Sequence, residues 1–285
     1  MTPDFSIVIP AHNEAAALGA LLPELRRLHP GCELIVVSDG SADDTPGIAE
    51  QCGARVVSLP VCMGNGAAVK AGARAAVHET IIFMDGDGQH APADVQRLLA
   101  GLEGGYLMAV GARNGKSQAS VFRLLANRFY NILASWITGQ RIADLTSGFR
   151  AVRTQRLREF LHLLPNGFSY PTTITMAFLR AGYPVRYVPI TAAPRVGRSH
   201  IRPLRDGVRF ALIIFRIGTL YSPLKIFFPI SATLFLLGMA NYLYTYITAA
   251  RFTNMSAMLL LSALFVFLIG LVSEQITALI YQRRN

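Results

Sequence analysis

Two aspartates, Asp85 and Asp87, stand two residues apart in the stretch DGDGQ at 85–89, directly after an apolar, β-rich run. Carboxylates at this spacing on a turn can converge on one hard cation. Mg²⁺ and Mn²⁺ take such oxygen ligands and keep open positions for diphosphate oxygens. Gln89 can add a ligand, directly or through water. Short Asp-Gly stretches are mostly turns, so this pattern needs support from the rest of the chain.

Two further turns place polar side chains after apolar runs. The first is IPAHNE at 9–14, whose simplest interpretation is a strand-to-helix turn in which Asn13 caps the helix. The second is SDGS at 38–41, where Asp39 is either an acceptor for a nucleotide-base N–H or another cap. Both interpretations stay open from these residues alone.

A glycine-rich turn, GNGAAVKAG at 64–72, enters a segment with helical spacing. Backbone N–H groups and the helix dipole at such a turn favour phosphate, and Lys70 adds a positive charge. The turn is not a GxxxxGK[ST] loop, because Lys70 lacks the preceding glycine and the following hydroxyl. It does not follow the first strand either, which argues against a dinucleotide oxidoreductase.

The segments that hold these turns alternate between strand and helix. Strands separated by helices of about ten residues predict βαβ units and a mostly parallel sheet. In such sheets ligands bind outside the carboxyl ends of the strands, which is where the polar turns stand. We expect strands at 5–10, 33–39, 55–59, 81–84, 107–111 and 183–190, and helices at 14–28, 44–51, 66–77, 94–102 and 121–136.

The last part of the chain contains two long stretches without charge, 226–250 and 252–273, separated by Arg251. Each can cross about 30 Å of hydrocarbon, which predicts a transmembrane hairpin over 224–285 with spans at about 226–250 and 252–280. Before it, arginines at 202, 205, 209 and 216 share one helical face, which predicts an amphipathic interfacial helix over 201–223. Basic residues flank both outer ends of the hairpin, so the positive-inside rule predicts that both lie in the cytoplasm.

Composition narrows the class of partner. The 285 residues are 52% hydrophobic and 15% charged, with a net charge of +10. A basic balance favours nucleic acid, an anionic membrane surface or phosphorylated substrates, and the apolar C-terminal stretches favour the last two over nucleic acid. The three cysteines, Cys32, Cys52 and Cys62, show no metal-binding spacing and are expected to be reduced thiols. The N-terminus lacks the features of a signal peptide, which predicts a cytoplasmic first domain.

Together these turns resemble the catalytic domain of glycosyltransferase family 2, and within it the polyprenyl-phosphate glycosyltransferases, such as dolichyl-phosphate mannose synthase and the bacterial undecaprenyl-phosphate sugar transferases. The matches are to P-x-x-N-E, DDGS-x-D-x-T (with Ser38 at the first aspartate), G-x-G-x-A-x-x-x-G and D-x-D-x-Q-x-x-P. DLTSGFR at 144–150 matches D-x-x-S-G-F-R, and RVGRSH at 195–200 resembles R-x-G-x-S-K. His12 replaces the usual aromatic residue and Cys62 an asparagine, and both departures bear on base recognition.

The resemblance implies an α/β chain with a GT-A domain over 1–200. It implies inverting transfer of a hexose, of glucose or mannose type, from a UDP- or GDP-sugar to a membrane polyprenyl phosphate, with Mg²⁺ or Mn²⁺ as cofactor. The implied metal ligands are Asp85, Asp87 and Gln89. The implied nucleotide-sugar-binding residues are Pro10, Asn13, Glu14, Asp39, Gly64, Lys70, Asp85, Gly86 and Asp87.

For the acceptor, the matching motifs assign Arg113, Arg128 and Ser147 to its phosphate, and Arg195 to the diphosphate. Arginine suits phosphate because its planar fork donates two parallel hydrogen bonds. The implied catalytic residues are Asp87, Asp144 and Arg195. Asp144 either orients the acceptor or acts as a base, or it forms a cap or buried salt bridge. A lipid phosphate is already ionised at pH 7, so direct displacement with inversion needs little help from a base.

Alternatives from other classes make different demands on the chain. A processive polysaccharide synthase carries a Q-x-x-R-W motif, whereas the one tryptophan here, Trp136, follows Ser135. Another membrane lipid glycosyltransferase stays open. A non-catalytic membrane scaffold is disfavoured by the intact Asp85, Asp87, Lys70 and Arg195. The donor sugar, the base, the lipid length and homo-oligomer formation are not determined by these residues.

Overall fold

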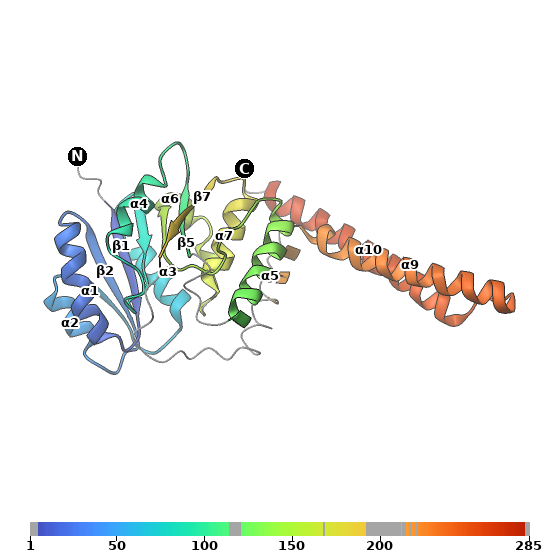
Figure 1. Ribbon diagram of the computed structural model, residues 1–285, viewed down its shortest axis with the longest axis horizontal. Helices are drawn as coiled ribbons and strands as arrows, with labels where there is room; N and C mark the ends of the chain where they lie inside the picture. The colour runs from blue at the N-terminus through green and yellow to red at the C-terminus, as the bar shows by residue number, and fades with distance from the viewer. Residues whose placement is uncertain are drawn as a thin grey trace. The chain divides into compact units, whose positions relative to one another are not determined.

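The computed structural model describes residues 5–113, 121–167, 169–191, 212, 215–216, 218–219 and 222–282 (Figure 1). The chain divides into two compact units, one of residues 1–135 and 140–213, the other of residues 136–139 and 214–285. Up to residue 190 the elements are β1 Ser6–Ala11, α1 Ala15–Leu28, β2 Glu33–Asp39, α2 Thr45–Gln51, β3 Arg55–Leu59, α3 Asn65–Ala75, β4 Thr80–Phe83, α4 Asp94–Ala100, β5 Met108–Arg113, α5 Val121–Thr138, β6 Arg150–Arg153, α6 Thr154–Arg158, η2 Leu161–Leu163, α7 Tyr170–Arg180 and β7 Val185–Ile190.

The strands form one seven-stranded sheet in the order β3-β2-β1-β4-β6-β5-β7. Every neighbouring pair is parallel except those that involve β6, which runs antiparallel to β4 and β5. The predicted mostly parallel sheet is therefore confirmed. Strand order turns back between β1 and β4, and at such a switch point the carboxyl ends of the strands open a crevice for ligands.

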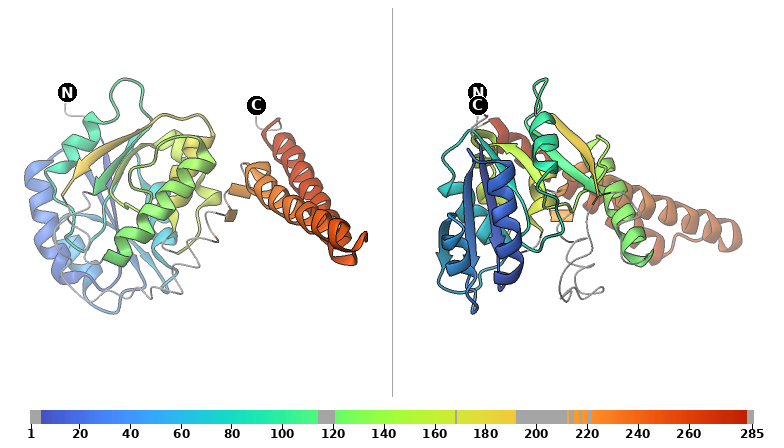
Figure 2. Two further views of the ribbon diagram at one scale, coloured as in Figure 1. Left: turned by 45° about the vertical axis from the view of Figure 1, so that its right-hand side comes forward. Right: turned by 60° about the vertical axis from the view of Figure 1, so that its left-hand side comes forward.

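Helices cover both faces of the sheet, as the strand side chains require (Figure 2). On one face Ile7 and Ile9 of β1 join the buried leucines of α1 and the apolar residues of α4 in one core. On the other face Gly72 of α3 lies against Val8 and Val37. Burying each large aliphatic side chain contributes about 1.5–3 kcal/mol, so this alternation fixes which face each helix covers.

The second unit contains a helical hairpin of α9 Pro223–Ala249 and α10 Asn254–Gln282. Ala250 reverses the chain in a left-handed conformation, with φ of 46°. The Ser231 hydroxyl donates to the Ala263 carbonyl at 2.8 Å, and Gly270 lets the backbone approach Phe227. Among the described residues these are two helices long and apolar enough to cross a membrane, at Pro223–Ala249 and Asn254–Leu279.

The expected elements and the observed ones differ mainly after residue 138. The strands expected at 33–39 and 55–59 have those bounds, and the three cysteines are free. Strand β6 and helices α6 and α7 were not expected. Residues 202, 205 and 209 of the expected interfacial helix lie outside the described residues.

Candidate active site

The first part of the candidate site lies at the carboxyl ends of β1 and β4, which are neighbours in the sheet. A Cβ on Gly86 would overlap the Glu14 carboxylate, so the missing side chain lets the 85–88 turn lie against the first strand. The Glu14 amide donates to the Thr45 hydroxyl at 3.0 Å. The structure thus brings Glu14, Gly86 and the two aspartates of the turn to one edge.

The second part links the ends of β1 and β2. Pro10 is buried in β1 opposite Val37. His12 Nδ1 lies 2.7 Å from the Asp39 carbonyl, and Asn13 Oδ1 accepts a hydrogen bond from the Ala42 amide at 2.7 Å. The interpretation of Asn13 as the cap of α1 is wrong, because its side chain is directed at this loop from a left-handed backbone, with φ of 56°.

Asp39 is buried, and both of its carboxylate oxygens face the turn that enters α3. Oδ1 accepts from the Met63 amide at 2.7 Å, and Oδ2 accepts from the Gly64 amide at 2.8 Å. The Cys62 thiol lies 3.5 Å from Oδ2; burial, with the hydrogen bond and charge of Asp39, raises the pKa of that thiol. Each carboxylate oxygen has a second lone pair, so Asp39 can hold the turn and still accept an N–H from a ligand.

The glycine-rich turn is packed against residues far along the chain. The Gly66 amide donates to the Gly167 carbonyl at 3.2 Å, and the Ala67 amide donates to the Asn166 carbonyl at 3.1 Å. A Cβ on Gly66 would overlap the Pro165 carbonyl. The Gly66 and Ala67 amides, which belong to the predicted phosphate-binding turn, are therefore hydrogen-bonded to the 164–167 segment in this conformation.

Lys70 reinforces that contact. Its Nζ donates to the Leu164 carbonyl at 3.0 Å and to the Asn166 side-chain oxygen. Burial, followed by the charge of Arg74, lowers the pKa of Lys70. In the described contacts Lys70 holds the 164–167 segment against α3 by hydrogen bonds. Its contact with the nucleotide sugar stays a prediction.

The 85–89 turn carries the predicted metal ligands. Asp87 is nearly buried and its Oδ1 accepts from the Gln89 amide at 3.1 Å. Asp85 Oδ2 lies 3.5 Å from Nε2 of His90, a residue that the sequence analysis did not single out. No three or more His, Cys, Asp or Glu side chains among the described residues gather to bind a metal. Two carboxylates completed by substrate phosphates are, however, a donor set that Mg²⁺ accepts.

The direction of β6 brings the DLTSGFR element to the same edge. Phe83 of β4 and Val110 of β5 both pair with Arg150, the first residue of β6. Because β6 is antiparallel to both neighbours, the residues before Arg150 lie beside those that follow β4 and β5. A Cβ on Gly148 would come 2.7 Å from Asp85 Oδ2. The acceptor motif and the metal motif therefore share a wall.

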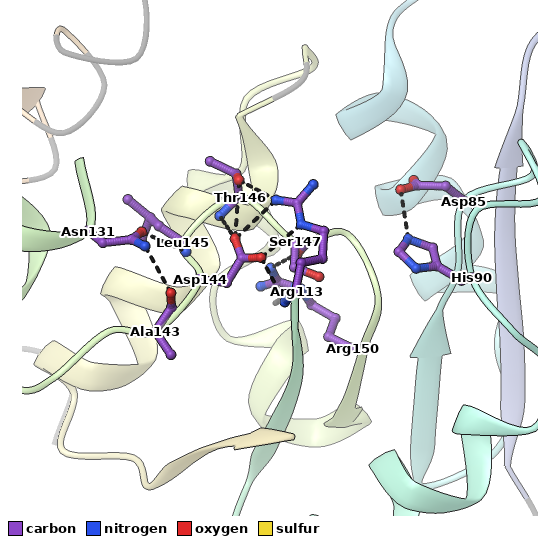
Figure 3. A network of polar contacts seen from close by, with 10 residues as sticks. All are labelled: Asp85, His90, Arg113, Asn131, Ala143, Asp144, Leu145, Thr146, Ser147 and Arg150. Atoms are coloured by element: carbon purple, nitrogen blue, oxygen red, sulfur yellow. Dashed lines mark hydrogen bonds and ion pairs between the residues drawn. The ribbon is translucent and has the colours of Figure 1, made fainter. Parts of the chain in front are cut away.

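Arg113 and Asp144 form a two-point ion pair (Figure 3). Arg113 Nε donates to Asp144 Oδ2 at 2.8 Å, and Nη2 donates to Oδ1 at 3.1 Å and to the Thr146 hydroxyl at 2.6 Å. Burial would raise the pKa of Asp144, but the hydrogen bonds and charge of Arg113, with the Arg113 and Thr146 amides, hold it below its ordinary value. An ionised carboxylate so engaged is a poor proton acceptor, which favours the salt-bridge interpretation of Asp144.

Behind this pair, Arg150 is fully buried. Nη1 donates to the Pro171 carbonyl at 3.2 Å and to the Thr175 hydroxyl at 3.1 Å, while Nη2 donates to the Ser147 carbonyl. Burial lowers the pKa of Arg150. The Tyr170 hydroxyl donates to the Gly148 carbonyl at 3.1 Å. Two consecutive carbonyls of the turn are thus tethered from the interior.

The other acceptor residues lie differently from one another. Ser147 is buried, and its hydroxyl has no hydrogen-bond partner among the described residues. Arg128 is exposed on α5. Arg195, assigned to the diphosphate, lies outside the described part of the chain together with 196–200. The structure therefore brings Arg113, Asp144 and Ser147 together, and the contacts of Arg128 and Arg195 with phosphate stay predictions.

Comparison with known families places these features in context. Residues 6–161 match the family described as Glycosyl transferase family 2, and residues 222–279 match the one described as GtrB C-terminal hairpin. The first match covers more than half of the 285 residues.

Individual proteins extend this likeness over most of the first unit. A dolichyl-phosphate hexose transferase of Haloferax volcanii is 31% identical over 75% of this chain and 93% of its own length. A polyprenol monophosphomannose synthase of Mycolicibacterium smegmatis is 28% identical over 66% of this chain and 77% of its own. Glucosyl-3-phosphoglycerate synthase of Mycobacterium tuberculosis, solved with Mn²⁺, UDP and glucosyl-3-phosphoglycerate, superposes with a TM-score of 0.59 at 26% identity, over 76% of this chain and 80% of that one. The predicted GT-A-type fold is confirmed.

Proposed function

The chain belongs to glycosyl transferase family 2, and from that membership we propose that it transfers a hexose from a nucleotide sugar to a polyprenyl phosphate in a membrane. The observation that carries this proposal is the shared edge at which Asp85 and Gly148 meet, beside the Arg113–Asp144 pair. That edge joins a metal and diphosphate motif to a phosphate-binding arginine. The polyprenyl and dolichyl phosphate carriers in the names of two relatives support the choice of acceptor class.

On the donor side, we assign the nucleotide to the carboxyl ends of β1 and β2, at Pro10, Asn13, Glu14 and Asp39, with Gly64 and Lys70 beside it. Asp85, Asp87 and Gln89 would hold Mg²⁺ or Mn²⁺. The neighbour solved with Mn²⁺ and UDP supports this assignment. When bound, the metal supplies charge stabilisation to the departing diphosphate. Gly86 contributes by keeping the turn close to the Glu14 carboxylate.

On the acceptor side, Arg113 uses Nε and Nη2 to bind Asp144 and Thr146, and among the described residues Nη1 has no such partner and can bind a phosphate oxygen. Arg128, Ser147 and Arg195 complete the proposed phosphate set. A phosphate monoester carries nearly two charges at neutral pH, so it can attack the anomeric carbon without losing a proton to the protein. Asp144 then acts by aiming Arg113, and direct displacement inverts the anomeric carbon through an oxocarbenium-like transition state.

The chain's apolar surfaces support a membrane location. Phe129 and Ile132 of α5 are exposed three residues apart on one helical face, beside Arg128. An apolar face bordered by a cation is typical of a helix in a membrane interface. We propose a cytoplasmic catalytic domain over 1–200, an interfacial helix over 201–223 and a two-span hairpin over 224–285.

The test is transfer of label from a panel of radiolabelled UDP- and GDP-hexoses by the full chain in detergent. One arm contains a polyprenyl phosphate, a second contains 3-phosphoglycerate, and a third contains no acceptor. We expect lipid-extractable label in the first arm only, with one base preferred. Label on 3-phosphoglycerate alone would replace the lipid acceptor by a soluble one. No transfer in any arm would favour a non-catalytic scaffold.

A further inference from the structure

Two residues from different parts of the chain, His90 and Gly148, lie close to the Asp85 carboxylate. His90 Nε2 lies 3.5 Å from Asp85 Oδ2. Gly148 is so close that a Cβ there would come 2.7 Å from the same oxygen. An aspartate on a turn can otherwise rotate about both side-chain bonds, the outer of which is broad in its preferences. These two neighbours therefore limit where the carboxylate is directed.

His90 is itself held rigidly. Its ring stacks on Phe149 with the ring centroids 4.8 Å apart and the planes 18° from parallel. Only 6% of His90 is exposed, and Phe149 is a fully buried member of the main core. His90 Nδ1 has no hydrogen-bond partner among the described residues. Burying a polar ring with so few partners is unfavourable for folding, which points to a role in the site.

Gly148 is also fixed in position. Arg150 Nη2 donates to the Ser147 carbonyl, and the Tyr170 hydroxyl donates to the Gly148 carbonyl at 3.1 Å. The pairing of Phe83 with Arg150 sets the distance along the sheet between Gly148 and Asp85. The backbone at Gly148 therefore cannot move easily away from the Asp85 carboxylate.

We propose that His90 is a positioning residue that holds the Asp85 carboxylate in the orientation that binds the metal. Phe149 fixes the histidine ring, and Gly148 blocks the carboxylate from turning away. This inference rests on the proposed function, because it takes Asp85 as a metal ligand. Residues that orient a metal ligand from outside the coordination sphere typically contribute roughly 10–100-fold to metal affinity or activity.

The experiment measures Mn²⁺ affinity of the full chain in detergent, in the presence of UDP, from the paramagnetic resonance signal of free Mn²⁺. His90→Phe keeps a ring to stack on Phe149 and removes the nitrogen. We expect its apparent Kd for Mn²⁺ to rise roughly 10–100-fold, at an unchanged melting temperature. His90→Gln carries an amide nitrogen at a similar distance from the backbone, and we expect it to recover most of the affinity. His162→Phe, at an exposed histidine of η2, is the matched control and should bind Mn²⁺ as wild type does.

Gly148→Ala tests the second neighbour of Asp85 independently, since Gly148 has no positive φ and its variant needs no strained backbone. It should also weaken Mn²⁺ binding, because the new methyl group displaces the Asp85 carboxylate. Wild-type affinity in His90→Phe, or equal losses in the Phe and Gln variants, would overturn the positioning role. If wild type itself bound no Mn²⁺ with UDP, the proposed metal site would fail, and the role of His90 with it. Mn²⁺ binding that is unaffected by His90→Phe and Gly148→Ala would refute this inference alone.

Discussion

Two glycine-containing turns lie at the same edge of the sheet, and their environments are opposite. The 64–66 turn enters α3 and is covered by protein: Gly66 and Ala67 donate to the carbonyls of Gly167 and Asn166. The 85–88 turn presents Asp85 and Asp87, and its Gly86 is packed against the Glu14 carboxylate. In both turns glycine permits a close approach, but in the first the approaching group is the chain's own backbone.

The difference teaches that a glycine-rich helix start is not by itself a phosphate site. A helix N-terminus offers unpaired amides to any nearby acceptor, and a carbonyl from the same chain satisfies them as well as an anion does. Lys70 completes the cover with its bonds to Leu164 and Asn166. We therefore expect the charged diphosphate of the donor to be bound mainly by the 85–89 turn. The 64–70 region is expected to contribute by packing and not by direct contact with phosphate.

The largest expected effect is on the acidic turn. Asp87→Ala should lower hexose transfer by at least about 10³-fold, because a metal contributes several kcal/mol of transition-state stabilisation. Initial rates with a saturating nucleotide sugar measure this, and circular dichroism reports folding. Asp94→Ala, which removes an exposed ion pair with Arg97, should keep wild-type activity. If the wild-type protein kept its full transfer rate when excess chelator removed the metal, the 85–89 turn would not be a metal site, and its contrast with the 64–66 turn would fail.

The next largest effect is expected at the 64–66 turn, as a loss of thermal stability. Gly66→Ala places a methyl group against the Pro165 carbonyl, and overpacking of this kind costs about 1–3 kcal/mol. Thermal melting of the full chain in detergent should therefore shift to lower temperature. Gly167→Ala changes a residue of the 164–167 segment in the same contact, where no described atom lies within 4 Å of the added Cβ, and should melt near wild type. A Gly66→Ala protein with normal melting and no activity would favour the phosphate-binding interpretation instead.

A smaller loss of stability is expected when Lys70, which is hydrogen-bonded to the 164–167 segment, is replaced. Lys70→Met removes the bonds to Leu164 and Asn166, each a partly exposed contact, and should destabilise the chain by about 1 kcal/mol. Asn166→Ala should lose part of the same energy, so a double-mutant cycle of the two should be non-additive. Arg74→Met on the same helix is the control. A loss of turnover as large as that of Asp87→Ala would place Lys70 on the diphosphate.

The smallest effect concerns pH and a third carboxylate. Burial opposes the ionised form of Asp144, yet Arg113 and two amides hold its pKa below the ordinary value of about 3.9. A lowered pKa means that the stability from this pair is present above the unfolded pKa and is lost as pH falls through the folded one. Between pH 5 and 8, stability and activity should therefore show no titration from Asp144. Unfolding of wild type and Asp144→Asn across pH 2–8 checks this, and the gap between them should close only in acid.

Much of the first unit could be predicted from local patterns. The β-branched runs of β2 and β3 and the helix spacing of α1 are properties of neighbouring residues, and their bounds agree with expectation to within one residue. Strand β6 could not be found in this way, because RAVR is short and basic, and the buried Arg150 depends on distant partners such as Pro171 and Thr175 of α7. Helix α7 is rich in threonine, which local propensity does not favour in a helix.

The candidate site divides along the same line. The aspartates and arginines were found because their types and spacing carry chemistry. The pairing of Lys70 with residues 94 and 96 positions away was not, and neither was the position of His90 between Asp85 and Phe149. Both depend on contacts with residues far along the chain, which local patterns do not indicate. For His90 the one available hint was its place in QHAP, next to the predicted ligand Gln89.

The single antiparallel strand has a consequence for how this protein can diversify. Because β6 hydrogen-bonds to β4 and β5 in a set register, the spacing from Asp85 to Gly148 and Arg113 is inherited from the sheet and not from loop length. Connecting segments tolerate insertions and sequence change far better than paired strands do. New sugars or carriers can therefore be accommodated by remodelling the connections around the edge, while the removal of one residue between Gly148 and Arg150 would misalign donor and acceptor together. The paired strands thus set the spacing of the reacting groups, and the connecting segments can change around them.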